Sequence, residues 1–133
     1  MIASYSNLAV KDSNLEKNEK TSHQDESQAL KRLSTKVKEI PPSVFSQVCE
    51  MLNVKQVRFN DFRMLAEKVG LTRYETDNID QRFQNPTEEI VNVWSHKGQA
   101  TVAKLIEWLK KDSFQRIDVV KILEGWVKER SSQ

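Results

Sequence analysis

The sequence predicts an all-α protein, a bundle of about six short helices that follows a disordered N-terminal tail. Apolar residues recur at intervals of three and four over residues 43–127, which is the spacing of one helical face. Glycine and proline number only three each among 133 residues, so few positions interrupt a helix. No segment carries the alternating pattern of a strand. The length predicts one modest domain and a tail.

We expect residues 1–28 to form the disordered tail, because they are mostly polar and bury too little apolar surface to offset the entropy of ordering. For residues 29–40 the pattern predicts either a lead-in helix or a strap that docks on the domain. Their aliphatic side chains recur at helical spacing: Leu30, Leu33, Val37 and Ile40. Pro41 and Pro42 end this segment, since the residue before a proline is disfavoured in a helix. The domain then spans residues 41–130.

The first helix of this domain is predicted over residues 43–52. Its apolar residues share one helical face: Val44, Phe45, Val48, Cys49 and Leu52. Cys49 is the only cysteine, which excludes an internal disulfide, and its neighbours predict a buried, unreactive thiol. After a polar loop, Asn60 or Asp61 caps the second helix, which ends at Gly70. The inward residues of the second helix are Phe62, Leu65, Ala66 and Val69.

A capping box marks the start of the third helix. Thr72 and Glu75 have the spacing at which each side chain accepts a hydrogen bond from the other residue's backbone amide. The helix that follows contains Tyr74, Ile79 and Phe83, and it is polar for its length.

Local signals also delimit the last three helices. Asn85 caps the fourth helix, with Pro86 at its first position and Gly98 at its end. Its inward residues are Ile90, Val91 and Trp94. Thr101 begins the fifth helix, whose apolar residues are Val102, Leu105, Ile106 and Leu109. Phe114 leads to the last helix, where the inner residues are Val119, Ile122, Leu123, Trp126 and Val127.

The sequence offers neither a catalytic constellation nor a metal site. His23 lies in the tail and His96 in the loop region after Trp94, so no histidine pair or Cys/His spacing exists for a metal. The glycines are isolated, which excludes a glycine-rich phosphate loop. We therefore predict no enzyme activity and no cofactor. No apolar run approaches the ~20 residues that span a bilayer, so we expect a cytoplasmic protein without a membrane partner.

A basic aromatic patch in the fifth helix leaves a second function open, that of a small helical nucleic-acid-binding protein. Its residues are Lys104, Trp108, Lys110 and Lys111. Glu107 and Asp112 interrupt this patch, and the net charge of the chain is only +2. A solvated helix face is the better interpretation, and we expect no nucleic acid partner.

Four motif blocks in residues 41–127 point to one family. The segment from Asp61 to Leu71 follows the pattern Asp-Trp-x-x-Leu-Ala-x-x-Leu-Gly, with Phe62 in place of the tryptophan. The other blocks are Pro86-Thr87 with Val93-Trp94, Ala100-Thr101-Val102 with Leu105, and Arg116-Ile117-Asp118-Val119-Val120. Through these blocks the chain resembles a death domain, a six-helix antiparallel bundle of receptor-proximal signalling assemblies. Within that family it is similar to the adaptor and kinase death domains of Toll/interleukin-1 and ectodysplasin receptor signalling.

The resemblance implies homotypic binding, in which helix ends and corners of one bundle meet different surfaces of another. It implies a non-catalytic cytoplasmic adaptor for death-domain receptors, adaptors or kinases, with self-association, in innate immunity or apoptosis. A decoy that occupies a partner and blocks assembly needs the same first contact, so both roles remain open. Charged residues of the second and third helices are the candidate protein-binding residues: Arg63, Glu67, Arg73, Glu75, Asp77, Asp80 and Arg82.

Overall fold

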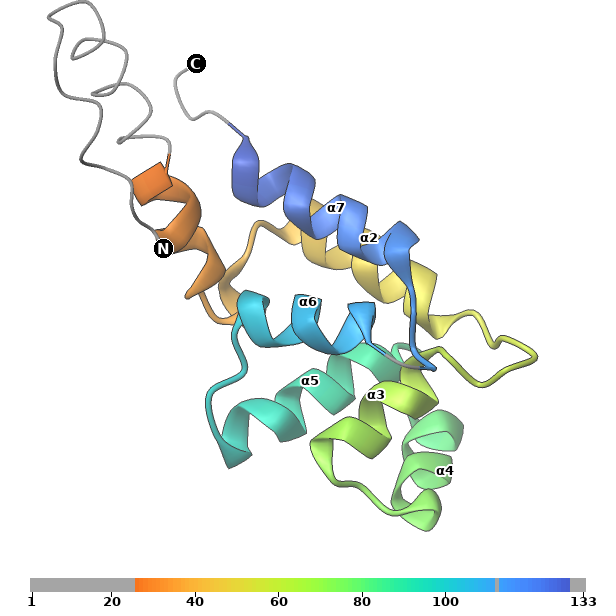
Figure 1. Cartoon of the computed structure of the whole chain (residues 1–133). Helices are drawn as coiled ribbons and strands as arrows, with labels where there is room; N and C mark the ends of the chain where they lie inside the picture. The colour runs from red at the N-terminus through yellow and green to blue at the C-terminus, as the bar shows by residue number, and fades with distance from the viewer. Residues whose placement is uncertain (1–25, 112, 130–133) are drawn as a thin grey trace, which may run out of the picture.

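The computed structural model describes residues 26–111 and 113–129, and its regular elements are helices (Figure 1). Six α-helices form the bundle: α2 (Pro42–Asn53), α3 (Phe62–Val69), α4 (Arg73–Arg82), α5 (Pro86–Lys97), α6 (Val102–Lys110) and α7 (Ile117–Lys128). Before them come the lead helix, residues 26–33, and the 3-10 turn η2 (Val37–Glu39). The predicted all-α class is confirmed. Among the described residues the only strand-like pairing is an isolated bridge between Lys36 and Thr101.

The predicted helix boundaries are confirmed by the capping contacts. Asp61, rather than Asn60, caps α3 by accepting a hydrogen bond from the Arg63 amide, and Gly70 ends α3 with a φ of 102°, where only glycine avoids a steric penalty. The Thr72–Glu75 capping box is present at the start of α4. The Asn85 side chain caps α5 by accepting a hydrogen bond from the Glu88 amide, and the Thr101 side chain caps α6 by accepting one from the Lys104 amide. Each cap satisfies a backbone amide that the helix itself leaves without an acceptor.

The core fills the space between α2, α3, α5, α6 and α7, which surround it in Figure 1. α2 packs against α7, α3 against α5, and α6 against α7. The largest fully buried side chains come from most of these elements: Leu52, Phe62, Leu65, Ile90, Leu105, Leu109, Phe114 and Leu123. The indole rings of Trp94 and Trp108 pack with centroids 4.6 Å apart. Burial of this many large apolar side chains stabilises the fold without a disulfide.

Cys49 is buried, as predicted, on the inner side of α2. Burial disfavours the charged thiolate and raises the pKa of the thiol to about 11, against a smaller opposing hydrogen bond to Asn85. The thiol is therefore protonated and unreactive in the folded protein.

The segment before the bundle combines the two alternatives that the sequence left open. Residues 26–33 are helical, whereas residues 34–40 run along the bundle as a strap, which ends with Val37 and Ile40 buried in the core. The Val37 amide donates to the Ala100 carbonyl at 2.8 Å, and the Val102 amide donates to the Thr35 carbonyl at 2.9 Å. The strap therefore continues the fold upstream of α2.

The structure differs from several sequence-based expectations. The predicted tail lies outside the described residues up to residue 25, and its last three residues belong to the lead helix. Leu30 is 67% exposed, because it lies on the outer side of that helix. His96 lies in the last turn of α5 and not in a loop, since the helix continues as far as Lys97. Ile122, Trp126 and Phe83 are not fully buried: the first two pack at the edge of the core, and Phe83 lies just beyond the end of α4.

Candidate functional site

The loop between α2 and α3, residues 54–61, exposes apolar side chains and is not the polar loop that we expected. Val57 is 94% exposed, Val54 59% and Phe59 48%. Exposed apolar side chains grouped in this way are typical of protein-binding surfaces. The sequence contains a signal for this exposure that we did not recognise. These three residues are apolar, yet they fall outside the inner faces of both flanking helices.

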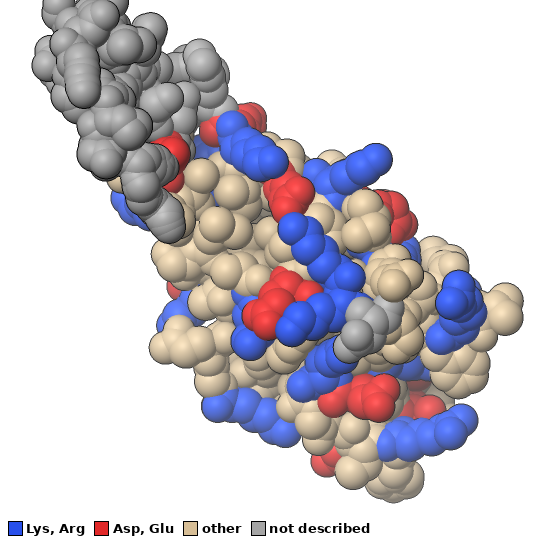
Figure 2. All heavy atoms as spheres, viewed as in Figure 1, with Lys and Arg blue, Asp and Glu red and all other residues tan. Residues whose placement is uncertain are grey.

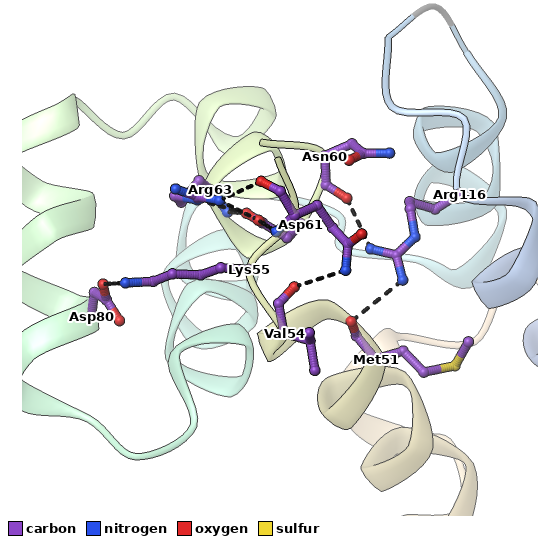
Figure 3. Close-up of polar contacts among 9 residues, drawn as sticks. Met51, Val54, Lys55, Asn60, Asp61, Arg63, Asp80 and Arg116 are labelled. Carbon is purple, nitrogen blue, oxygen red and sulfur yellow. Dashed lines mark hydrogen bonds and ion pairs between the residues drawn. The ribbon is translucent and has the colours of Figure 1, made fainter. Parts of the chain in front are cut away.

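The loop is held in one conformation by Asp61 and Arg63 (Figure 3). The buried Asp61 carboxylate accepts hydrogen bonds from the Gln56 amide at 2.6 Å, the Arg63 amide at 3.0 Å and the Arg63 guanidinium. Arg63 Nη2 also donates to the Gln56 carbonyl at 3.0 Å. The Arg63 guanidinium lies 4.1 Å from the centre of the Phe59 ring, a cation–π contact. Phe59 adopts a φ of 66°, which is strained for a residue with a side chain.

These contacts also set the charge of Asp61. Burial alone would raise the pKa of this carboxyl group, but the hydrogen bonds from Arg63 and from the Gln56 amide outweigh it, so the pKa is lowered from its ordinary value of 3.8. The pKa of Arg63 is raised, chiefly by its hydrogen bond to Asp61 and to a smaller extent by Asp80 and Asp77. Both groups are therefore charged at neutral pH.

Arg116, which precedes α7, holds the base of the loop from the other side (Figure 3). Its Nη1 donates to the Asn60 carbonyl at 2.9 Å, and its Nη2 donates to the Met51 carbonyl at 3.4 Å. Asp118 pairs with the same guanidinium at 3.0 Å. The hydrogen bond to Arg116 lowers the pKa of the Asp118 carboxyl group against the opposing effect of burial. Arg116 thus joins α2, the loop and α7.

An ion pair places the loop beside α4. Lys55 Nζ lies 2.7 Å from Asp80 Oδ2, and Figure 3 shows the Lys55 side chain extending from the loop to this helix. Asn53 and Asn85 are hydrogen-bonded at 2.9 Å, so the end of α2 lies beside the start of α5, just after α4. We call the exposed residues of the loop and of α4 the loop–α4 surface. It combines apolar side chains with both signs of charge.

The seven predicted binding residues lie on α3 and α4. Arg63 and Asp80 are partly buried and hold the loop, as described above. Glu75 is exposed, but its carboxylate accepts the Thr72 amide in the capping box at 2.8 Å, and this contact lowers its pKa. The remaining four are exposed: Glu67 on α3, and Arg73, Asp77 and Arg82 on α4. Tyr74 joins them on α4 with 76% of its surface exposed.

The lysines of α6, and Lys111 just after it, are paired with carboxylates. Lys104 and Lys111 contact Glu107 at 3.3 Å and 3.1 Å, and Lys110 contacts Glu124 at 3.1 Å. Trp108 packs on Trp94 and is half-buried. Figure 2 shows acidic side chains beside the basic ones on this face. Asp112 lies outside the described residues.

Two further features concern metal binding and membrane spanning. In the described part of the chain, no group of three or more His, Cys, Asp or Glu side chains could hold a metal ion. No helix there is long and apolar enough to cross a lipid bilayer.

The comparison with protein families gave one result that covers most of the bundle. The family model described as the death domain matches residues 45–127, which run from α2 to the last turns of α7. Neither curated proteins nor solved structures gave a significant match. The family match covers more than half of the sequence and the whole loop–α4 surface, and the chain therefore belongs to the death-domain family.

Proposed function

We propose that this chain is a non-catalytic cytoplasmic signalling adaptor that binds other death domains through the loop–α4 surface. Death domains are modules for protein–protein interaction in signalling, which supports homotypic binding as the basic activity. The observation that carries the location is the contact between the apolar loop and the charged helix α4, made by Lys55 and Asp80.

The composition of this surface suits a specific protein contact. Val57 and Phe59 offer apolar area that a partner would remove from water. Arg73, Asp77 and Arg82 add exposed charges of both signs on α4, which select a partner and its orientation more than they add affinity. The contacts of Arg63 and Asp61 order the loop before binding, which reduces the entropy lost on association.

The motif blocks support receptor-proximal signalling as the setting. Their similarity to adaptor and kinase death domains of Toll/interleukin-1 and ectodysplasin receptor signalling leads us to propose receptors, adaptors or kinases as partners, in innate immunity or apoptosis. We also propose self-association, because surfaces of opposite charge on one chain favour head-to-tail contacts between copies. The nucleic-acid alternative is disfavoured by the ion pairs of Lys104, Lys110 and Lys111.

The proposal is tested by capture of the full chain on a panel of immobilised death domains. We expect binding to at least one member and a loss of at least tenfold in affinity for the double variant Asp77→Lys, Asp80→Lys. The matched control is Glu26→Lys, Glu39→Lys, which makes the same change of charge on the lead helix and strap and should bind as the wild type does. Equal loss in both double variants would show a general charge effect and contradict the proposed surface.

A second step separates an adaptor from a decoy. The complex with the first partner is exposed to a second death domain from the panel. An adaptor retains the second protein, because it has a further surface for binding. A decoy blocks it, which would overturn the adaptor role while leaving homotypic binding intact.

A further inference from the structure

Ser34 lies at a joint between a loosely held helix and a firmly held strap. It is exposed in the turn after the lead helix, and its hydroxyl donates to the Lys31 carbonyl at 2.9 Å. The strap beyond it is fixed by backbone hydrogen bonds: Thr35 contacts Val102 of α6, and Val37 contacts Ala100 just before that helix. A change at Ser34 can therefore move the lead helix without displacing the strap.

The lead helix is held to α7 mainly by Arg32. Its Nη1 donates to the Trp126 carbonyl at 2.5 Å and to the Glu129 carbonyl at 2.9 Å. The same guanidinium lies 5.2 Å from the centre of the Trp126 ring. The apolar contacts are few, since Ala29 and Leu33 are only partly buried. Arg32 thus satisfies carbonyls at the end of α7 that the helix leaves without donors.

The residues before Ser34 also form a recognition pattern. Lys31 and Arg32 stand three and two positions before the serine, so the hydroxyl follows two positive charges. A protein kinase whose substrate groove is acidic recognises such a segment by charge complementarity. Ser113 follows a pair of lysines with the same spacing, but both lysines are ion-paired and Asp112 directly precedes the serine. Ser34 is therefore the better substrate of the two.

We propose that Ser34 is a phosphorylation site for a serine/threonine kinase that prefers basic substrates, and that its phosphorylation releases the lead helix from α7. The γ-phosphoryl group of ATP is transferred to Ser34 Oγ: the new P–O bond forms, the β–γ anhydride bond breaks, ADP leaves, and the hydroxyl proton goes to a carboxylate of the kinase. This proposal does not depend on death-domain binding.

Two effects of the phosphate lead to release. The hydroxyl loses its proton and no longer donates to the Lys31 carbonyl, and about two negative charges now lie at the carboxyl end of the lead helix, where the helix dipole disfavours them. The phosphate is also a better acceptor for the Arg32 guanidinium, two residues away, than the carbonyls of Trp126 and Glu129 are. Arg32 therefore leaves α7.

The site is tested by incubating the full chain with ATP and the catalytic subunit of cAMP-dependent protein kinase. We expect one phosphoryl group, located on Ser34 by mass-spectrometric fragmentation, and almost none on the Ser34→Ala variant. The matched control, Ser113→Ala, should be phosphorylated as fast as the wild type. Phosphorylation confined to Ser113 or to the tail would overturn the site.

Release of the helix is tested by hydrogen exchange on the same samples. Loss of charge-assisted hydrogen bonds should speed exchange of the amides in residues 26–33 by about tenfold. Exchange in residues 37–40 and in α6 should stay unchanged. Unphosphorylated Arg32→Ala should show the same faster exchange, because it lacks the contact with α7. Phosphorylated protein that keeps the wild-type exchange rate in residues 26–33 would overturn the release.

Discussion

Lys55 and Asp80 form an ion pair with an N–O distance of 2.7 Å, and this contact joins the loop after α2 to α4. The two residues are 25 positions apart in the sequence, yet together they bring the apolar loop side chains beside the charged face of α4. Because both side chains are partly exposed, the pair adds no more than about 1 kcal/mol to the free energy of unfolding. Its main role is positional.

The first prediction concerns variants in which the charges of Lys55 and Asp80 are exchanged. Asp80→Lys alone should weaken death-domain binding because Lys55 is repelled and the loop moves. The double variant Lys55→Asp, Asp80→Lys should recover most of this loss, since the pair re-forms with reversed polarity. Binding affinities of the three proteins decide the question. If the double variant binds as weakly as Asp80→Lys does, Asp80 contacts the partner directly rather than positioning the loop.

A second prediction concerns the apolar part of the surface. Val57→Ser should leave the free energy of unfolding within about 0.5 kcal/mol of the wild type, because the side chain is almost fully exposed. It should weaken partner binding by about fivefold to tenfold, through the apolar area no longer buried. Leu30→Ser is the control, because Leu30 is another exposed aliphatic residue but lies on the lead helix. Similar losses in both variants would argue against a specific role of the loop.

The third prediction is a pH dependence at Asp61. Its pKa in the folded protein is below 3.8, its ordinary value, so its ionised form stabilises the fold at neutral pH, and this contribution is lost as the pH falls below 3.8 through the folded-state pKa. Asp61→Asn keeps a capping side chain but removes the charge that pairs with Arg63. We expect it to lower the free energy of unfolding by about 1–3 kcal/mol at pH 7.

Urea unfolding of both proteins at pH 7 and at pH 3 measures this difference. The gap in the free energy of unfolding between wild type and Asp61→Asn should narrow at pH 3, because below pH 3.8 the unfolded chain takes up a proton at Asp61 that the folded protein resists. A gap of the same size at both pH values would mean that the variant loses packing or geometry, and not charge.

A fourth prediction concerns the strap, which lies outside the residues matched by the family model. Ile40→Ala should lower the free energy of unfolding by about 2–5 kcal/mol, because Ile40 is almost fully buried in the core of the bundle. Leu30→Ala on the exposed side of the lead helix should change it by no more than about 0.5 kcal/mol. Urea unfolding of the full chain tests both. Equal stability of Ile40→Ala and wild type would show that the strap is not part of the cooperative unit.

Helix boundaries were predictable from the sequence because their determinants are local. Asp61 with Gly70, and Thr72 with Glu75, mark the ends of helices through contacts within a few residues, and the same contacts are present in the structure. Inner faces were predictable from the spacing of apolar side chains, except at four residues whose exposure depends on packing between elements: Leu30, Phe83, Ile122 and Trp126.

Contacts between residues that lie far apart in the sequence were not predictable in this way. Arg116 reaches the Asn60 carbonyl across 56 positions, and Arg32 reaches the Trp126 carbonyl across 94. Neither contact has a periodic or capping signature. For the same reason, the sequence indicated Arg63 and Asp80 as charged binding residues but gave no sign that both order the loop after α2.

The central claim, that this chain binds other death domains through the loop–α4 surface, is tested most directly by size-exclusion chromatography with light scattering. The full chain is run alone, with each purified death domain of the panel, and again as Asp77→Lys, Asp80→Lys. Our account predicts a complex of higher mass with at least one member, which the double variant does not form. A chain that keeps the mass of the free protein with every member, or a complex that the double variant forms equally well, would contradict it.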